Sequence, residues 1–208
     1  FVLKPAELTP HTSMLLLDVM DKAGLPKGAG NLITGAGKSA GAPLSSDPRV
    51  DMVSFTGGLE TGRHLASEAS LTVKKIALEL GGKNPNVIFA DADYDAALDN
   101  AMNAAFVHSG QVCSAGARLV VEESIAERFV TDLVARAEKV RLGGPFDEKA
   151  ETGALISEAH REKVSNYVAH AREQGARVRC GGAFGTGPTA DGSASLDDGW
   201  FYLPTVID

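Results

Sequence analysis

The stretch that decides the fold is Met52-Val53-Ser54-Phe55-Thr56-Gly57-Gly58-Leu59-Glu60-Thr61-Gly62. An apolar run typical of a strand ends at two glycines, and a segment of helical period begins directly after them. The same alternation recurs along the chain, with further strands expected at residues 1–3, 31–34, 74–80, 86–90 and 119–121. Short strands that alternate with helical segments predict an α/β fold in which helices cover a parallel sheet.

Helices are expected between these strands. They cover residues 9–24, 60–69, 95–106, 125–134 and 164–171. Thr9 or Thr12 is expected to cap the first helix, and the apolar face of the last is expected to hold Val164, Tyr167, Val168 and Ala171. Residues 181–199 are rich in Gly, Ser, Thr and Asp and lack periodicity, which predicts a long surface loop.

The composition excludes several classes of partner. Twenty Lys and Arg oppose 27 Asp and Glu, giving a net charge of −7, and the absence of a basic stretch argues against nucleic acid as a partner. The apolar run Met14–Leu17 is far shorter than the roughly 20 residues of a membrane span. Two cysteines give no disulfide framework, which favours a reducing, cytoplasmic location. The chain opens at Phe1 as if within a strand, so we expect a fragment.

Cys113 is the candidate nucleophile. It lies in Gly110-Gln111-Val112-Cys113-Ser114-Ala115-Gly116, where small neighbours leave room for a substrate and for close approach of the backbone. Reactivity requires an accessible thiol and a lowered pKa or a nearby base. The competing interpretation is that the cysteine is a small buried hydrophobe, which fits Cys180 beside Val178 better.

Glu79 is the candidate general base. It lies within an apolar strand that ends at Gly81 and Gly82. Burial there would raise its pKa toward the working pH, as general base catalysis requires. The alternative, with equal weight on this residue alone, is a structural carboxylate that pairs with a nearby lysine, one of Lys74, Lys75 and Lys83.

A glycine-rich turn offers a place for a diphosphate. Residues 56–62 follow a strand and open a helix, so backbone N–H groups and the helix dipole can face an anion. Their glycine spacing departs from the usual dinucleotide fingerprint and is weak evidence alone. Lys4 and Glu7, after the first strand, are candidates for hydrogen bonds to ribose, although each taken singly is more often a solvated charge.

Two other patterns, a partial P-loop and the histidines, do not predict a nucleotide or metal site. Gly37-Lys38-Ser39 resembles the end of a P-loop, but that pattern requires a glycine where this chain has Leu32, so a nucleoside triphosphatase is not expected. The five histidines show no metal-ligand spacing, and no metal site is predicted. His108 lies five residues before Cys113, which keeps a Cys-His hydrolase open as an alternative.

Taken together, four motifs in order resemble the aldehyde dehydrogenase superfamily. They are Val2-Leu3-Lys4-Pro5-Ala6-Glu7-Leu8-Thr9-Pro10, Phe55-Thr56-Gly57-Gly58-Leu59-Glu60-Thr61-Gly62, Leu78-Glu79-Leu80-Gly81-Gly82-Lys83-Asn84-Pro85 and Gly110-Gln111-Val112-Cys113. The resemblance extends over essentially the whole chain, including residues 153–157. It implies a Rossmann-like cofactor half at residues 1–80 and an α/β catalytic half at residues 81–208, both incomplete.

The resemblance also implies a mechanism. The Cys113 thiolate would attack an aldehyde, the thiohemiacetal would give up hydride to NAD, and Glu79 would activate the water that hydrolyses the resulting thioester. An acid at Glu7 would repel a 2′-phosphate, which favours NAD over NADP. The expected cofactor-binding residues are Lys4, Glu7, Gly57, Gly58, Thr61, Gly62, Leu80 and Gly81.

Two departures from the family pattern matter. Gly58 stands where many members carry Ser, so one side-chain contact to the diphosphate is absent. The resemblance also implies that the segments supplying an oxyanion-hole Asn and a Glu for the nicotinamide ribose are expected outside these 208 residues, and losing an oxyanion donor typically costs about 10²–10³-fold in rate.

Residues 106–118 look most like the betaine-aldehyde branch, and the resemblance implies a homo-oligomer that acts on a small aldehyde. The alternatives are a non-catalytic NAD-binding or assembly fragment and an ester or thioester hydrolase that uses Cys113.

Overall fold

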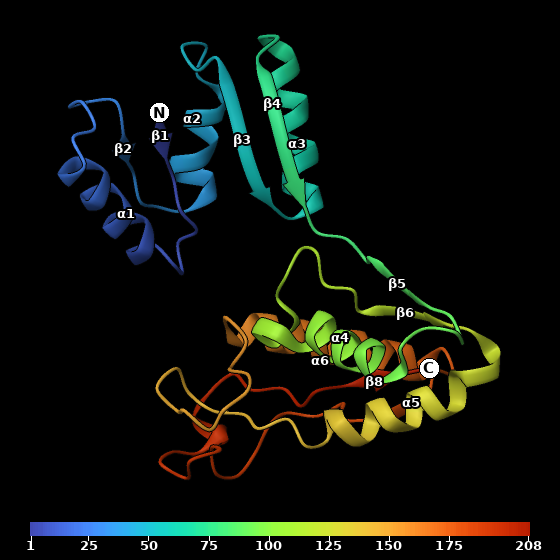
Figure 1. The fold of residues 1–208 in the computed structure, drawn as a ribbon. Coiled ribbons are helices and arrows are strands. Elements are labelled where there is room, and N and C mark those ends of the chain that lie inside the picture. The colour runs from blue at the N-terminus through green and yellow to red at the C-terminus, as the bar shows by residue number, and fades with distance from the viewer. The chain divides into compact units, whose positions relative to one another are not determined.

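Strands and helices alternate along the chain in the computed structural model, which describes residues 1–208 (Figure 1). The chain divides into two units, Phe1–Gly81 and Gly82–Asp208, with the change between them one residue beyond Leu80. The predicted α/β class is confirmed, and the sheets are short, with two strands each.

The first unit holds two parallel strand pairs. β1 (Val2–Leu3) pairs with β2 (Asn31–Leu32), and β3 (Met52–Gly57) pairs with β4 (Lys75–Leu80). Along β3, exposed and half-buried residues alternate, as expected for a strand covered on one face. The register runs from Met52 opposite Lys75 to Gly57 opposite Leu80, so both strands end together.

Helices follow β1, β2 and β3, whereas β4 is the last element of the first unit. They are α1 (His11–Lys22), the π-helical turn η1 (Gly37–Gly41), α2 (Ala42–Ser46) and α3 (Leu59–Leu71). The predicted cap at Thr9 or Thr12 is wrong, because Pro10 occupies the cap position and no side chain bonds there. Pro is favoured beside a helix start since its fixed φ suits the first turn. On α3, Gly62, Leu65 and Ala69 are buried.

The second unit is built around a compact apolar cluster. β5 (Pro85–Ile88) pairs in parallel with β6 (Arg118–Val121), and α4 (Tyr94–Phe106) and α5 (Glu123–Ala137) pack beside them. The cluster contains Ile88, Leu98, Ala101, Phe129 and Leu133, all at most 5% exposed. α4 begins at Asp93, whose carboxylate accepts a hydrogen bond from the Ala96 N–H at 3.1 Å.

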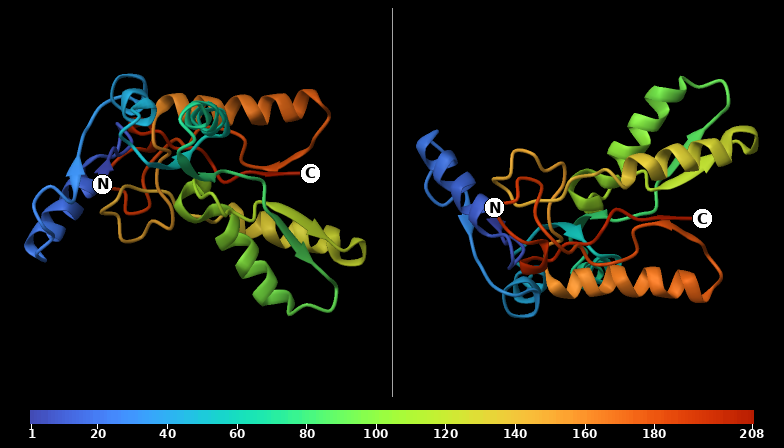
Figure 2. Two further views of the ribbon diagram at one scale, coloured as in Figure 1. Left: turned by 90° about the horizontal axis from the view of Figure 1, so that it is seen from above. Right: turned by 90° about the horizontal axis from the view of Figure 1, so that it is seen from below.

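The C-terminal part of this unit departs from a uniformly parallel sheet. α6 (Glu158–Glu173) leads to β7 (Val178–Cys180), which pairs antiparallel with β8 (Val206–Ile207). Figure 2 shows α6 on one side of the C-terminal strand and α4 and α5 on the other. On α6, Val168 is buried but Tyr167 is 68% exposed, so the expected apolar face is only partly covered.

Residues 181–199 are more ordered than the predicted surface loop. Leu196, in the short 3-10 helix η3 (Leu196–Asp198), packs with Leu142 and Phe201 in a second buried cluster. The Phe184 and Tyr202 rings meet edge to face with their centroids 6.0 Å apart, a spacing typical of aromatic pairs. The segment therefore supports a core and is not simply solvated.

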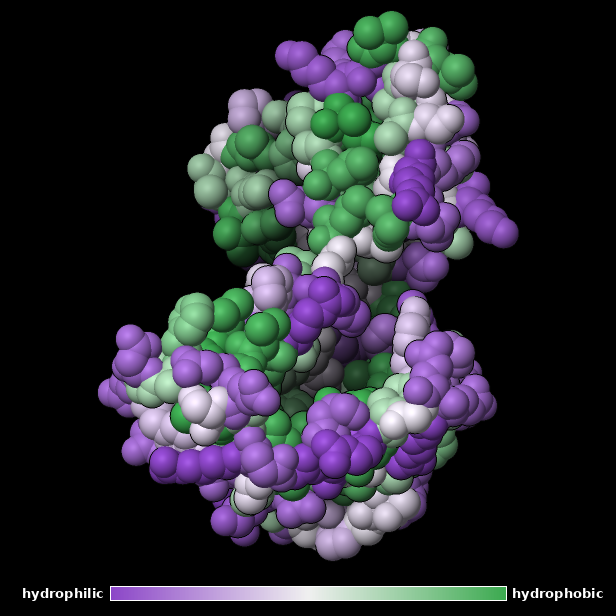
Figure 3. All heavy atoms as spheres, turned by 90° about the vertical axis from the view of Figure 1, so that its right-hand side faces the viewer, coloured by the Kyte–Doolittle hydropathy of each residue, from purple (hydrophilic) through white to green (hydrophobic).

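Hydrophobic side chains also reach the surface in both units (Figure 3). α1 has no buried residue. On the β5–β6 pair, Ile88 faces the core, whereas Val87 and Val120 are 53% and 48% exposed. None of the helices combines the length and the apolar character needed to cross a membrane.

Candidate active site

The chain reverses sharply between α4 and Cys113. Val107–Gly110 form the 3-10 turn η2, in which His108 and Ser109 have φ of 51° and 57° and Gly110 has φ of 72°. Left-handed backbone is unfavourable for residues with a Cβ, and two such residues together cost on the order of 2 kcal/mol. The turn therefore persists only because contacts around it hold it in place.

Those contacts come from a segment further along the chain. The Ser109 N–H donates to Thr152 Oγ1 at 3.0 Å, and the Ser109 hydroxyl donates to the Gly153 carbonyl at 2.6 Å. Gln111 Oε1 accepts from the Ile156 N–H at 3.0 Å, while its amide donates to a carbonyl within the turn. Ser109 and Gln111, on either side of Gly110, are thus tied to residues 152–156.

Asn84 holds the other side of the cysteine. Its amide donates to the carbonyl of Cys113 at 2.9 Å and to that of Ala115 at 3.3 Å. Gly116, three residues after the cysteine, is buried, and a Cβ there would lie 3.3 Å from the Cβ of Ala104. The backbone around the thiol is therefore fixed on both sides.

The two cysteines differ in accessibility. Cys113 is a free, exposed thiol, so the interpretation of this residue as a buried hydrophobe is wrong. Cys180 is free and buried, and burial raises the pKa of its thiol. Of the two thiols, Cys113 is therefore the one that a reactant can reach.

Glu79 lies on β4 opposite Thr56 of β3. Its side chain is exposed in the first unit, so the expected burial is not present there. It forms no ion pair, and Lys74 instead donates to the carbonyls of Ser45 and Asp47 at 2.7 and 2.8 Å. The alternative of a structural carboxylate paired with Lys74, Lys75 or Lys83 is therefore not observed.

The glycine-rich turn joins β3 to α3. Gly58 is the N-cap, has an extended backbone, and has nothing within 4 Å of the position where a Cβ would stand. No side chain caps the helix, so N–H groups of its first turn, which includes the exposed Thr61, are available to an anion. Gly62 packs closely on Leu80, since an added Cβ would lie 2.8 Å from Leu80 Cδ2.

Lys4 joins the ends of β1 and β2. Its ammonium donates to the carbonyls of Pro5 at 2.6 Å and Gly35 at 3.1 Å, and lies 4.0 Å from the Glu7 carboxylate. The Lys4 side chain is only 17% exposed and Glu7 is 57% exposed. Lys4 is thus a fixed charge, and the interpretation as a freely solvated lysine is wrong.

The predicted site residues fall into three groups. Gly57, Gly58, Thr61 and Gly62 surround the start of α3, beside the ends of β3 and β4 where Glu79, Leu80 and Gly81 lie. Lys4 and Glu7 share the end of β1, and Cys113 lies in the second unit. No group of three or more His, Cys, Asp or Glu side chains is arranged to hold a metal ion.

The sequence did not predict that Thr152 and Asn84 bind the cysteine turn, and only the structure shows these contacts. Asn84 lies in a motif already singled out, but nothing in that motif shows that its amide reaches the cysteine turn. Thr152 is 43 residues from Ser109, and neither composition nor periodicity signals this contact. The one available signal is Ser109-Gly110 directly after a helix, which is typical of a turn.

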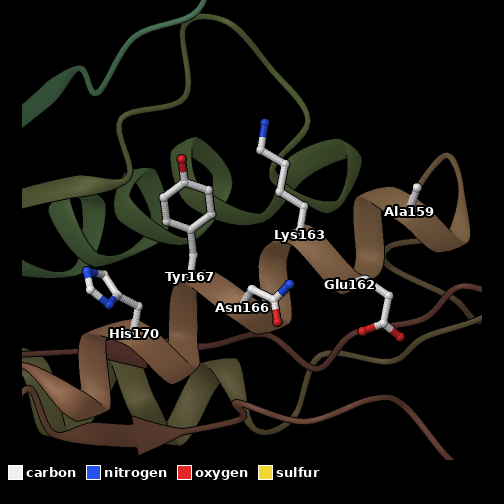
Figure 4. Close-up of a pocket in the computed structure, with 6 residues that line it drawn as sticks. All are labelled: Ala159, Glu162, Lys163, Asn166, Tyr167 and His170. Carbon is white, nitrogen blue, oxygen red and sulfur yellow. The ribbon is translucent and has the colours of Figure 1, made fainter.

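A surface groove of about 580 Å³ lies elsewhere, along α6. Figure 4 shows Lys163 and Tyr167 pointing to the same side of the helix, whereas Glu162 points away. All residues that line it come from α6, and none is a predicted site residue. We assign it no role in the chemistry.

Known proteins resemble this chain in sequence over nearly its full length. The family model described as "Aldehyde dehydrogenase family" matches residues 1–208. Betaine aldehyde dehydrogenase of Bacillus subtilis (strain 168) is 48% identical over 206 residues, which are 99% of this chain and 41% of that protein. 4-trimethylaminobutyraldehyde dehydrogenase B of Danio rerio is 41% identical over 207 residues, or 100% of this chain and 39% of that protein.

The fold has solved counterparts. A crystal structure of betaine aldehyde dehydrogenase from Staphylococcus aureus in complex with NAD+ superposes with a TM-score of 0.92 and 47% identity. The match covers 99% of this chain and 40% of that one. The chain thus spans about two fifths of the length of these relatives.

Proposed function

The chain belongs to the aldehyde dehydrogenase family, and we propose that the protein oxidises an aldehyde to a carboxylic acid with NAD as the electron acceptor. The observation that carries this proposal is the single exposed thiol, Cys113, on a turn held by hydrogen bonds on both sides. We assign residues 1–80 to the cofactor half and residues 81–208 to the catalytic half.

Cys113 is the proposed nucleophile. Its sulfur forms a bond to the aldehyde carbon, and the carbonyl oxygen becomes an oxyanion. The Cys113 N–H donates no hydrogen bond in the structure, so it is free to stabilise this charge. Asn84, which binds the carbonyl of the same residue, restricts the peptide around it. Loss of hydride from the carbon leaves a thioester on the sulfur.

Glu79 is the proposed base for the second half of the reaction. Its carboxylate takes a proton from water, the water oxygen bonds to the thioester carbon, and the carbon–sulfur bond breaks. The products are a carboxylic acid and the Cys113 thiolate. The exposed position of Glu79 on β4 is consistent with access to water.

The first unit has features that fit a dinucleotide. The uncapped start of α3 and the open space at Gly58 suit a diphosphate, and the absence of a side chain at Gly58 leaves the contacts to backbone N–H groups. When bound, NAD supplies the acceptor for the hydride. The contacts of Gly57, Thr61, Gly62, Leu80 and Gly81 with it belong to this proposal.

Lys4 and Glu7 are the proposed partners of the adenosine ribose. The Lys4 ammonium is held near the ends of β1 and β2, and the Glu7 carboxylate lies 4.0 Å away in a partly exposed position. A carboxylate there repels a 2′-phosphate, which is the basis for NAD over NADP. Glu7→Gln is expected to lower KM for NADP more than KM for NAD, and equal changes would argue against this assignment.

Betaine aldehyde is the proposed substrate, by similarity to relatives whose names specify betaine aldehyde or a trimethylamino aldehyde. We also propose a cytoplasmic homo-oligomer, to be checked by cell fractionation and light scattering.

The function is tested by NADH absorbance with betaine aldehyde and, separately, a simple aliphatic aldehyde, using full-length protein. Cys113→Ala should abolish the signal and Cys180→Ala should retain it. Signal with the aliphatic aldehyde alone would discard the substrate, while activity in Cys113→Ala would discard the mechanism. Ester turnover without NAD would instead support a hydrolase.

A further inference from the structure

The Thr152 hydroxyl has a specific role in the turn before Cys113. It accepts the Ser109 N–H at 3.0 Å, and its oxygen also lies 3.0 Å from the Ser109 hydroxyl and 3.4 Å from the Phe106 carbonyl. Because the Ser109 hydroxyl proton goes to the Gly153 carbonyl, Thr152 supplies the proton for one of these two contacts. One hydroxyl thus satisfies both a donor and an acceptor of the turn.

Removing that hydroxyl would leave the Ser109 N–H without its partner. Ser109 is only partly exposed, and it lies beside His108 in a left-handed conformation that the backbone disfavours. An unpaired donor in a strained turn raises the free energy of that conformation and so favours relaxation to another one. Any such change reaches Cys113, four residues further along.

Thr152 is itself held firmly. Its N–H donates to the Arg141 carbonyl at 3.3 Å, and its carbonyl accepts from the Gly143 N–H at 3.2 Å. Leu142, between these two residues, is 6% exposed and packs with Leu196. The hydroxyl is therefore presented to the turn by a segment fixed to the second buried cluster.

We propose that Thr152 is a positioning residue for Cys113, acting through Ser109 to keep the turn in its left-handed conformation and the thiol in its reactive position. This inference rests on the proposed function for its kinetic consequence. The dependence of thiol reactivity on Thr152, however, is measurable without aldehyde or NAD.

The test compares three variants of the full-length protein. Thr152→Val keeps the shape and removes the hydroxyl, Thr152→Ser keeps the hydroxyl, and Thr131→Val is the matched control. The Thr131 hydroxyl bonds only to the carbonyl of Glu127 within α5. The readouts are the rate of Cys113 alkylation by iodoacetamide, followed by mass spectrometry, and separate values of kcat and KM.

Thr152→Val is expected to change the alkylation rate at least threefold and to lower kcat about tenfold, the size expected from losing one partly buried hydrogen bond. KM for NAD should change less than about twofold, because the cofactor residues lie in the other unit. Thr152→Ser should restore both rates to within about threefold of the parent, and Thr131→Val should match the parent. If Thr152 had only a structural role, Thr152→Val would lower stability. Thr152→Ser would then not restore the rates, and kcat would not fall while KM for NAD stayed nearly constant.

Parent-like alkylation and kcat in folded Thr152→Val would overturn the inference. If that variant does not fold, Thr152→Ala provides the test, since it removes the same hydroxyl acceptor of the Ser109 N–H with a smaller side chain in its place. Unchanged alkylation in Thr152→Ala would then overturn the inference. If no aldehyde is oxidised but alkylation still depends on Thr152, the proposed function fails and the positioning role stands.

Discussion

Asn84→Ala should loosen the cysteine turn by a measurable amount. Asn84 directly precedes β5, and β6 begins at Arg118, opposite Pro85. The parallel pairing of these strands therefore brings Asn84 alongside the segment that leads from Cys113 into β6. Its amide bridges two carbonyls of that segment, those of Cys113 at 2.9 Å and Ala115 at 3.3 Å.

The two hydrogen bonds set the expected magnitude. A typical intramolecular hydrogen bond contributes about 0.5–1.5 kcal/mol net. The longer bond to Ala115 contributes less to the free energy of unfolding. Because Cys113 is exposed, water can also replace part of the hydrogen bond that its carbonyl loses. We therefore expect Asn84→Ala to lower the free energy of unfolding by about 1 kcal/mol. Asn84→Asp should cost more near neutral pH, because its carboxylate has no N–H and faces two carbonyl oxygens.

Urea denaturation at pH 7, followed by circular dichroism, measures this difference. The matched control is Asn100→Ala, at an exposed position on α4 where the side chain makes no hydrogen bond, and it should stay within about 0.5 kcal/mol of the parent. Equal stability of Asn84→Ala and Asn100→Ala, together with unchanged Cys113 alkylation, would refute the role given to this amide.

Three further predictions concern stability. Phe129→Ala, at a side chain that is 0% exposed, should lower the free energy of unfolding by about 3–5 kcal/mol in urea denaturation, whereas Phe146→Ala, at 96% exposure, should leave it within about 0.5 kcal/mol. Gly62→Ala should destabilise by about 1–3 kcal/mol, since its Cβ would lie 2.8 Å from Leu80, and calorimetry with an unchanged Tm would contradict this close packing. Hydrogen bonds from the Ser193 backbone, the Ser193 hydroxyl and a neighbouring threonine lower the pKa of Asp191 to about 2. A lowered folded-state pKa gives stability that is present above the unfolded value of about 3.9 and lost as pH falls toward 2. The Tm of Asp191→Asn should therefore fall less than that of the parent between pH 4 and pH 2, and parallel Tm curves would contradict the assignment.

The order of strands and helices was predictable because the residues within each element carry its hydrophobic pattern. The run before Gly57 and the periodic residues after Gly58 gave β3 and α3 nearly in full. Residues 37–46 were missed, because small residues and Pro43 carry no helical period there. The antiparallel pairing of β7 with β8 was also missed, since the period of a strand does not reveal its partner.

The candidate site was predictable in its residue types and less so in its surroundings. Small residues around Cys113 correctly indicated access to the thiol. Apolar neighbours of Glu79 suggested burial, yet β4 pairs only with β3 and leaves this side chain exposed. Contacts such as that of Thr152 with Ser109 depend on how distant segments meet, which no local pattern contains.

Trapping the acyl-enzyme tests the central claim most directly. Full-length Glu79→Gln protein, which lacks the proposed base for thioester hydrolysis, is incubated with NAD and an aldehyde substrate, quenched in acid and digested for mass spectrometry. We predict that the peptide containing Cys113 gains the mass of the acyl group, while the peptide containing Cys180 stays unmodified. Substrate oxidation with no acyl group on Cys113, or with the acyl group on Cys180, would contradict this mechanism.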